Sequence, residues 1–115
     1  MKIAVINDNS KKNKMWSEIF NGKIETFSHP GYFFYMMEKN KNNEFDVVIL
    51  DRMYHEHDAL KDHTAKKIRS ILPRVKIFLS SALHSENEKI PGFDAVIDQW
   101  PLDIDSIQKI LARVQ

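Results

Sequence analysis

The segment FDVVILDRMYHEHDAL, Phe45 to Leu60, holds the most informative pattern in this 115-residue sequence. It opens with a nearly continuous apolar run, which is typical of a strand covered on both faces within a parallel sheet. The run ends at Asp51, and a polar stretch rich in histidine and acidic residues follows. Ligands of open parallel sheets bind beyond the carboxyl ends of the strands. Asp51 is therefore the first candidate for a functional residue.

Similar short apolar runs lie on both sides of this segment, separated by stretches with helical spacing. We predict five strands, at Lys2 to Ile6, Lys23 to Phe27, Asp46 to Leu50, Lys76 to Ser80 and Ala95 to Ile97. The predicted core stripes of the helices contain Trp16, Ile19 and Phe20; Phe33, Met36 and Met37; Leu60, Thr64, Ile68, Ile71 and Leu72; and Ile104, Ile107, Ile110, Leu111 and Val114. This alternation predicts an α/β fold with a doubly wound, five-stranded parallel sheet.

One connection between strands is too short for a full helix. Only Leu83 to Phe93 separates the fourth and fifth strands, and Pro91 and Gly92 interrupt that stretch. We expect a shortened fourth helix of one or two turns around Ser85 to Lys89.

The charge balance and the lack of cysteine exclude several classes of protein but do not identify a ligand. The chain has 17 basic and 16 acidic residues, a formal net charge of +1 and no cysteine. This balance gives no indication of a nucleic-acid or membrane partner, and the lack of cysteine excludes disulfides and thiolate chemistry. No run approaches the roughly 20 apolar residues of a membrane span. We therefore expect one domain over residues 1–115, located in the cytoplasm.

Four of the predicted strands are followed by residues that could meet in one pocket, namely Asp8, Asp51, Ser81 and Trp100. Two facing carboxylates repel each other and favour a hard divalent cation such as Mg²⁺ between them. Such a site could hold a phosphoryl group, with a carboxylate as the nucleophile. From spacing alone, ordinary acidic loop residues remain the alternative interpretation.

Phe45 to Leu60 also resembles the signature of response regulator receiver domains, in which an apolar strand ends in the phosphoacceptor. The resemblance gives Asp51 that role and makes Asp58 the later aspartate that opens the third helix. MKIAVINDN is similar to the first strand of the family, with Asp8 in the metal-binding position of its acidic pair and Asn7 in the other. The backbone carbonyl of Met53 would be a further metal ligand.

The resemblance continues to the end of the chain. Ser81 in the SSA motif, Ser80 to Ala82, stands where receivers have a switch hydroxyl, and Gln99 to Pro101 stands at the family's Lys and Pro pair. It implies a chemotaxis-receiver-like, flavodoxin-like fold and a role in two-component, phosphorelay signal transduction. It also implies Mg²⁺ as cofactor, a histidine kinase or phosphotransfer protein as phosphoryl donor, and a downstream protein partner.

Several residues depart from the family pattern. Trp100 replaces a nearly invariant lysine, and a neutral indole cannot supply that charge. Asn7 replaces a carboxylate, which weakens Mg²⁺ binding. Met53 and Leu83 are apolar where receivers orient water, so we expect slow loss of the phosphoryl group. Two functions remain open: an atypical receiver phosphorylated on Asp51, and a phosphorylation-independent pseudo-receiver that binds a protein partner.

Other interpretations have less support. A phosphohydrolase of the haloacid-dehalogenase type needs an acid where Met53 stands, so enzyme activity is expected only as self-phosphorylation and slow self-dephosphorylation. His55, His57 and His63 fit an exposed polar turn better than a transition-metal site. Tyr32 to Met37, YFFYMM, is apolar over most of a helix, so half of it should be core, and a homodimer or partner contact there is the alternative.

Overall fold

The computed structural model describes residues 2–19, 24–40, 44–54, 57–81, 88–97 and 104–114. These residues form a five-stranded parallel sheet in the order β2-β1-β3-β6-β7. The strands are β1 (Ile3–Ile6), β2 (Ile24–Phe27), β3 (Val47–Asp51), β6 (Lys76–Ser80) and β7 (Ala95–Ile97). The order reverses direction between β1 and β3, which is where parallel α/β sheets of this order bind ligands.

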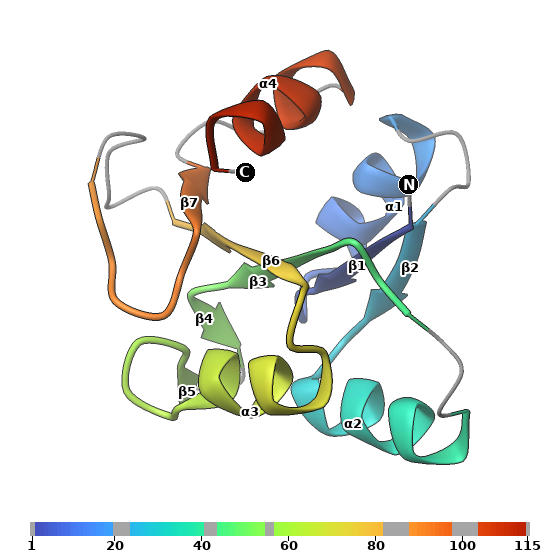
Figure 1. The fold of residues 1–115 in the computed structure, drawn as a ribbon. Coiled ribbons are helices and arrows are strands. Elements are labelled where there is room, and N and C mark those ends of the chain that lie inside the picture. Colours follow the sequence, from blue (N-terminus) through green and yellow to red (C-terminus); the bar gives the residue numbers. More distant parts are fainter. Residues whose placement is uncertain are drawn as a thin grey trace.

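Helices cover both faces of the sheet (Figure 1). The described helices are α1 (Ser10–Ile19), α2 (Pro30–Lys39), α3 (Thr64–Ile71) and α4 (Ile104–Val114). α1 and α4 lie on one face, and α2 and α3 lie on the other. The sheet is therefore doubly wound, as the sequence predicts.

The side chains of the central strands alternate between two separate cores. In β3, Val47 and Ile49 point toward Trp16 of α1 and Ile107 of α4, and the side chains between them point to the other face. The second core contains Val48 and Leu50 of β3 together with Phe33, Met37, Ala65 and Ile68 from α2 and α3. Both faces of β3 are fully buried, which explains its uninterrupted apolar sequence.

The predicted strands agree with the structure to within one residue at the ends that the structure describes. Helix α3 differs from the prediction. It begins at Thr64, and Asp58, predicted to open it, lies in a two-stranded hairpin of β4 (Met53–Tyr54) and β5 (His57–Asp58). The Asp58 carboxylate instead accepts the Leu60 N–H at 3.0 Å and so caps a turn. Leu60 belongs to that turn and not to α3.

The predicted short helix around Ser85 to Lys89 lies mostly outside the described residues. Its last two residues, Glu88 and Lys89, are described and are not helical. From there the chain passes through a turn at Gly92, whose φ of 87° suits glycine, and enters β7.

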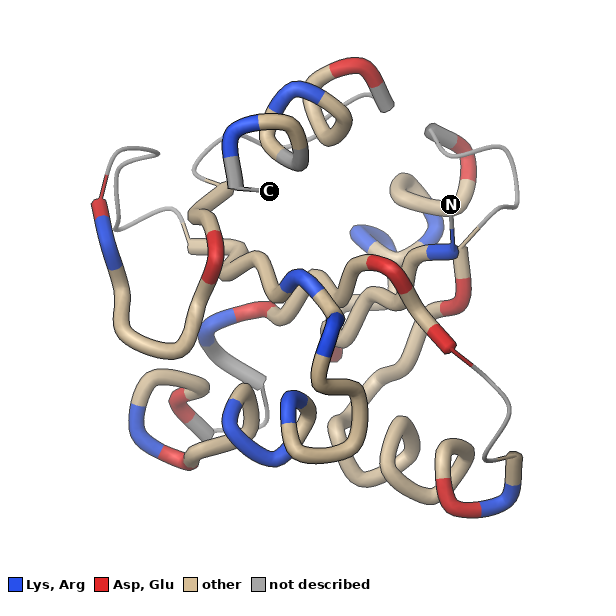
Figure 2. Tube along the Cα trace, in the orientation of Figure 1, with Lys and Arg blue, Asp and Glu red and all other residues tan. Residues whose placement is uncertain are grey.

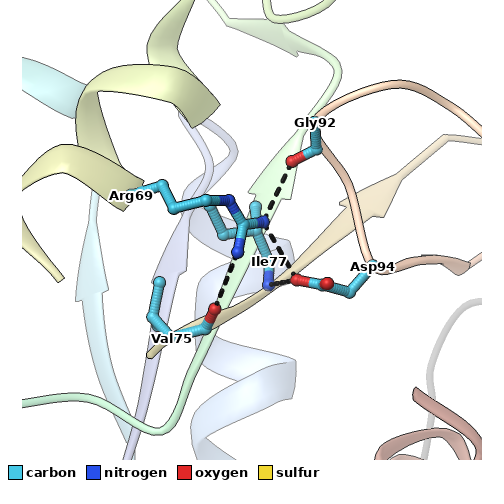
Figure 3. Close-up of polar contacts among 5 residues, drawn as sticks. All are labelled: Arg69, Val75, Ile77, Gly92 and Asp94. Carbon is cyan, nitrogen blue, oxygen red and sulfur yellow. Dashed lines mark hydrogen bonds and ion pairs between the residues drawn. The ribbon is translucent and has the colours of Figure 1, made fainter. Parts of the chain in front are cut away.

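Arg69 links the end of α3 to this returning chain. Figure 3 shows its guanidinium donating to the carbonyls of Val75 (3.2 Å) and Gly92 (3.1 Å) and pairing with the Asp94 carboxylate at 3.0 Å. The same carboxylate oxygen accepts the Ile77 N–H at 2.8 Å. The cluster therefore fixes the start of β7 against the start of β6.

Charged residues of both signs are scattered over the helices and loops on both sides of the sheet (Figure 2). This distribution agrees with the near-neutral charge of the sequence. Within the described residues, no helix is both long enough and apolar enough to span a membrane.

Candidate functional site

The predicted site residues that the structure describes lie at one edge of the sheet. β1 ends just before Asn7 and Asp8, β3 ends with Asp51, and β6 ends just before Ser81. Because β1, β3 and β6 are parallel neighbours, these residues meet at the carboxyl edge, beside the point where the strand order reverses. The predicted convergence of the first, third and fourth strands is therefore present.

The loop between β1 and α1 is held by asparagines. Asn7 is only 2% exposed, and its Oδ1 accepts the Asn9 N–H at 2.9 Å. Asn13 of α1 donates from Nδ2 to the Asn7 carbonyl at 2.8 Å. The bond from Asn9 uses the side-chain oxygen of Asn7 within the loop. The neighbouring Asp8 is exposed and is therefore the residue of this pair that can reach a cation.

Asp51 is partly buried, and its pKa is the one most strongly shifted at this edge of the sheet. Because it continues the alternation of Val47 and Ile49, its side chain belongs to the sheet face covered by α1. Burial raises the pKa of Asp51 most strongly, and the charge of Asp8 raises it further. The charge of Lys12 lowers this pKa, and the nearby Arg52 N–H lowers it least. The net result is a pKa of about 6. The Arg52 N–H itself donates to the Ser80 carbonyl at 3.0 Å. A raised pKa at a ligand-binding edge is a common property of functional carboxylates.

The Met53 backbone is well placed to offer its carbonyl oxygen. The Ala59 N–H donates to the Arg52 carbonyl at 2.6 Å, so Arg52 and Ala59 form a hydrogen-bonded pair of the hairpin. Pairs alternate in antiparallel strands, and Met53 with Asp58 is therefore the pair without mutual hydrogen bonds. It follows that the Met53 carbonyl points away from β5.

These donors fit a hard divalent cation. The charge of Asp8 raises the pKa of Asp51, and a cation between the two carboxylates would relieve that repulsion. Two carboxylates, one backbone carbonyl and waters are the donor set that Mg²⁺ takes. The buried Oδ1 of Asn13, which has no hydrogen-bond partner among the described residues, offers a further polar atom beside this loop.

Ser81 is 7% exposed and follows β6. Its N–H donates to the Ile97 carbonyl at 3.0 Å, and Asp51 is in register with the preceding Ser80. Ser81 thus comes one residue after the partner of Asp51, at the end of the neighbouring strand. The side chains predicted at Trp100, Ala82 and Leu83 lie outside the described residues, as does His55.

Lys12 is a member of this site that the sequence predictions missed. It is half-buried in the first turn of α1, and its charge is the strongest influence that lowers the pKa of Asp51. The predictions considered only residues at strand ends. Lys12 also has lysines close to it in the sequence, which is typical of a solvent-exposed helix surface. Its spacing of four residues from the core residue Trp16 was the available clue, because such residues share a helix face.

The other two features noted in the sequence are the histidine-rich turn and the aromatic helix α2. Among the described residues, no group of three or more His, Asp or Glu side chains could hold a metal ion. Helix α2 divides as the sequence predicts: Phe33 and Met37 are buried, whereas Tyr32 and Tyr35 are 64% and 61% exposed. The two tyrosines line an open depression of about 520 Å³ together with His29 and Gly31.

No protein-family model matches the sequence, and no curated protein matches it significantly. Solved structures match its fold. A CheY-like response regulator receiver domain from Methylobacillus flagellatus gives a TM-score of 0.73 at 18% identity, over 100% of this chain and 98% of that chain. A chain of the CheX–CheY–BeF3–Mg²⁺ complex from Borrelia burgdorferi gives 0.73 at 19% identity, over 99% and 88%. A chain of the complex of histidine kinase ThkA with response regulator protein TrrA gives 0.71 at 20% identity, over 99% and 98%. The chain therefore has the fold of response regulator receiver domains.

Proposed function

We propose that this chain is an atypical response regulator receiver domain of a two-component system that accepts a phosphoryl group on Asp51. The observation that supports this most is the place of Asp51. It ends the central strand at the strand-order reversal, with Asp8 close enough to raise its pKa. A receiver fold with two carboxylates at this point offers a nucleophile beside a cation site.

In the proposed reaction, a carboxylate oxygen of Asp51 attacks the phosphorus of a phosphohistidine or of acetyl phosphate. A new O–P bond forms, the bond between phosphorus and the donor breaks, and the donor leaves with that electron pair. Asp8, Asp51 and the Met53 carbonyl would hold Mg²⁺, which when bound offsets the negative charge of the phosphoryl oxygens. The Ser81 hydroxyl would donate a hydrogen bond to one of those oxygens.

Partners and location follow from this role. The phosphoryl donor would be a histidine kinase or a phosphotransfer protein, as one structural neighbour is bound in a kinase–regulator complex. We expect the domain to work in the cytoplasm, which suits a chain without cysteine.

Intact-mass spectrometry after incubation with acetyl phosphate and Mg²⁺ tests the proposal. The wild type should gain the mass of one phosphoryl group, and Asp51→Asn should gain none. Trp100→Lys restores the charge that the family resemblance places there and should accept the phosphoryl group faster. If neither the wild type nor Trp100→Lys gains mass, the proposal is wrong.

A pseudo-receiver that binds a protein partner without phosphorylation is the second candidate. The exposed tyrosines of α2 favour it, since Tyr32 and Tyr35 present aromatic surface beside an open depression. Partner binding that is unchanged in Asp51→Asn but lost in the double variant Tyr32→Ser, Tyr35→Ser would support it. Binding lost in folded Asp51→Asn would count against it.

A further inference from the structure

The first turn of α1 lies over the sheet edge that contains Asp51. Trp16 is completely buried in the core between α1 and the sheet, beside Val47 and Ile49 of β3. Lys12 precedes Trp16 by four residues, so it lies on the same face of α1, one turn closer to the helix start. Since α1 starts at the carboxyl edge, the Lys12 side chain leaves the helix over the strand ends and is half-buried there.

Two sets of hydrogen bonds fix this turn in place. Asn9 Oδ1 accepts the N–H groups of Lys11 (3.0 Å) and Lys12 (3.1 Å), which caps the helix. Asn13 Nδ2 donates to the Asn7 carbonyl at 2.8 Å and joins the same turn to the end of β1. The backbone of Lys12 is therefore held against the end of β1, the strand that leads to Asp8.

The charge of Lys12 acts on Asp51. Asp51 continues the alternation of Val47 and Ile49, so its side chain belongs to the sheet face that α1 covers, the face on which Lys12 lies. In agreement with this shared face, the charge of Lys12 lowers the pKa of Asp51. Arg52, the next residue after Asp51, is directed elsewhere, because its guanidinium pairs with Asp58 at 3.4 Å. Lys12 is thus the cationic side chain that the described part of the chain brings to this carboxylate.

We propose that Lys12 supplies the positive charge that faces a phosphoryl group on Asp51. The inference rests on the proposed function and deepens it. The acyl phosphate carries two negative charges where the carboxylate carried one, and an ammonium at this edge can contact its oxygens as a charged donor. Trp100, at the position of the family's lysine, cannot provide that charge. Lys12 makes no bond in the transfer and stabilises the charge that the transfer brings in.

The test compares Lys12→Met and Lys12→Arg with Lys11→Met, an exposed neighbour on the same helix turn. With acetyl phosphate and saturating Mg²⁺, Lys12→Met should be phosphorylated about tenfold to a hundredfold more slowly than the wild type. Lys12→Arg should keep most of the rate because it keeps the charge, and Lys11→Met should match the wild type. Circular dichroism confirms that each variant is folded.

A second measurement does not depend on phosphorylation. Carboxyl ¹³C shifts followed through a pH titration give the midpoint of Asp51 directly, and Lys12→Met should raise it while Lys11→Met leaves it unchanged. If Lys12→Met equals Lys11→Met in both measurements, the inference is overturned. If the wild type accepts no phosphoryl group yet Lys12→Met still raises the midpoint, the proposed function fails, and Lys12 stands only as the charge partner of the carboxylate.

Discussion

Asp8 and Asp51 stand at the ends of neighbouring strands on either side of the strand-order reversal, and the charge of Asp8 raises the pKa of Asp51. Burial acts in the same direction and more strongly, and Lys12 opposes both. The resting site thus contains two carboxylates and one ammonium. This arrangement leaves Asp51 easier to protonate than an ordinary aspartate, and it gives a cation a favourable place to bind.

The first prediction concerns stability and pH. The pKa of Asp51 is about 6 in the folded chain against 3.8 for an ordinary aspartate, so the folded state binds this proton more readily. Ionised Asp51 therefore destabilises the fold above pH 6, and the cost disappears as pH falls from 6 toward 4. The full difference corresponds to about 3 kcal/mol, which solvent screening at a partly buried side chain reduces to about 1–2 kcal/mol.

Urea denaturation of Asp51→Asn measures this effect. The variant should be more stable than the wild type by about 1–2 kcal/mol at pH 7.5, without Mg²⁺, and the difference should vanish near pH 4. Glu38→Gln, an exposed position on α2, is the matched control and should show no such change. A variant that is less stable than the wild type at pH 7.5 would contradict the burial of an ionised Asp51.

Mg²⁺ should stabilise the wild type and not the variants that lack a carboxylate ligand. At a concentration about tenfold above its Kd, a ligand that binds only the folded state stabilises it by about 1.4 kcal/mol. Thermal unfolding with and without Mg²⁺ should show this gain in the wild type and in Glu38→Gln. Asp8→Asn and Asp51→Asn should lose it, and an equal gain in Asp8→Asn would place the cation elsewhere.

Most of the fold is predictable from the sequence because every strand of the main sheet except the edge strand β2 has buried side chains. The uninterrupted apolar runs of β1, β3 and β6 follow from burial on both faces, and their ends fall within a residue of the prediction. Asp51 ends β3, Ser81 follows β6 directly, and Asp8 lies two residues beyond β1. Their meeting at one edge is a consequence of parallel topology and needs no knowledge of loop geometry.

The errors occur where short-range hydrogen bonds decide the structure. Asp58 has the sequence of a helix start, but its carboxylate accepts the Leu60 N–H and closes a turn after the β4–β5 hairpin. Asx turns and helix caps use the same local bond, so sequence does not distinguish them here. The role of Lys12 was missed for a different reason, since it depends on the contact between α1 and β3, which are far apart in the sequence.

The Arg69 cluster should contribute clearly to stability. Arg69→Met removes hydrogen bonds to two carbonyls and the ion pair with Asp94, which leaves that carboxylate bonded to the Ile77 N–H. We expect a loss of about 1.5–3 kcal/mol in urea denaturation. Lys66→Met, exposed on the same helix, should change stability by less than about 0.5 kcal/mol. Equal effects of the two substitutions would mean that the cluster adds nothing.

Helix α2 should separate into a structural and a surface face. Phe33 is fully buried, and its ring packs edge-on against Phe27 at a centroid distance of 5.4 Å, so Phe33→Ala should cost about 3–5 kcal/mol. Tyr32→Ser and Tyr35→Ser remove exposed rings and should each cost no more than about 0.5 kcal/mol. A large loss from either tyrosine variant would show that its ring is packed and unavailable to a partner.

The site of modification tests the central claim most directly. After reaction with acetyl phosphate and Mg²⁺, borohydride reduction converts an acyl phosphate to an alcohol, and tandem mass spectrometry then locates the converted residue. We expect conversion at Asp51 and at no other aspartate, and no conversion in Asp51→Asn. Conversion at Asp8 or Asp58, or its complete absence from the wild type, would contradict phosphorylation of Asp51.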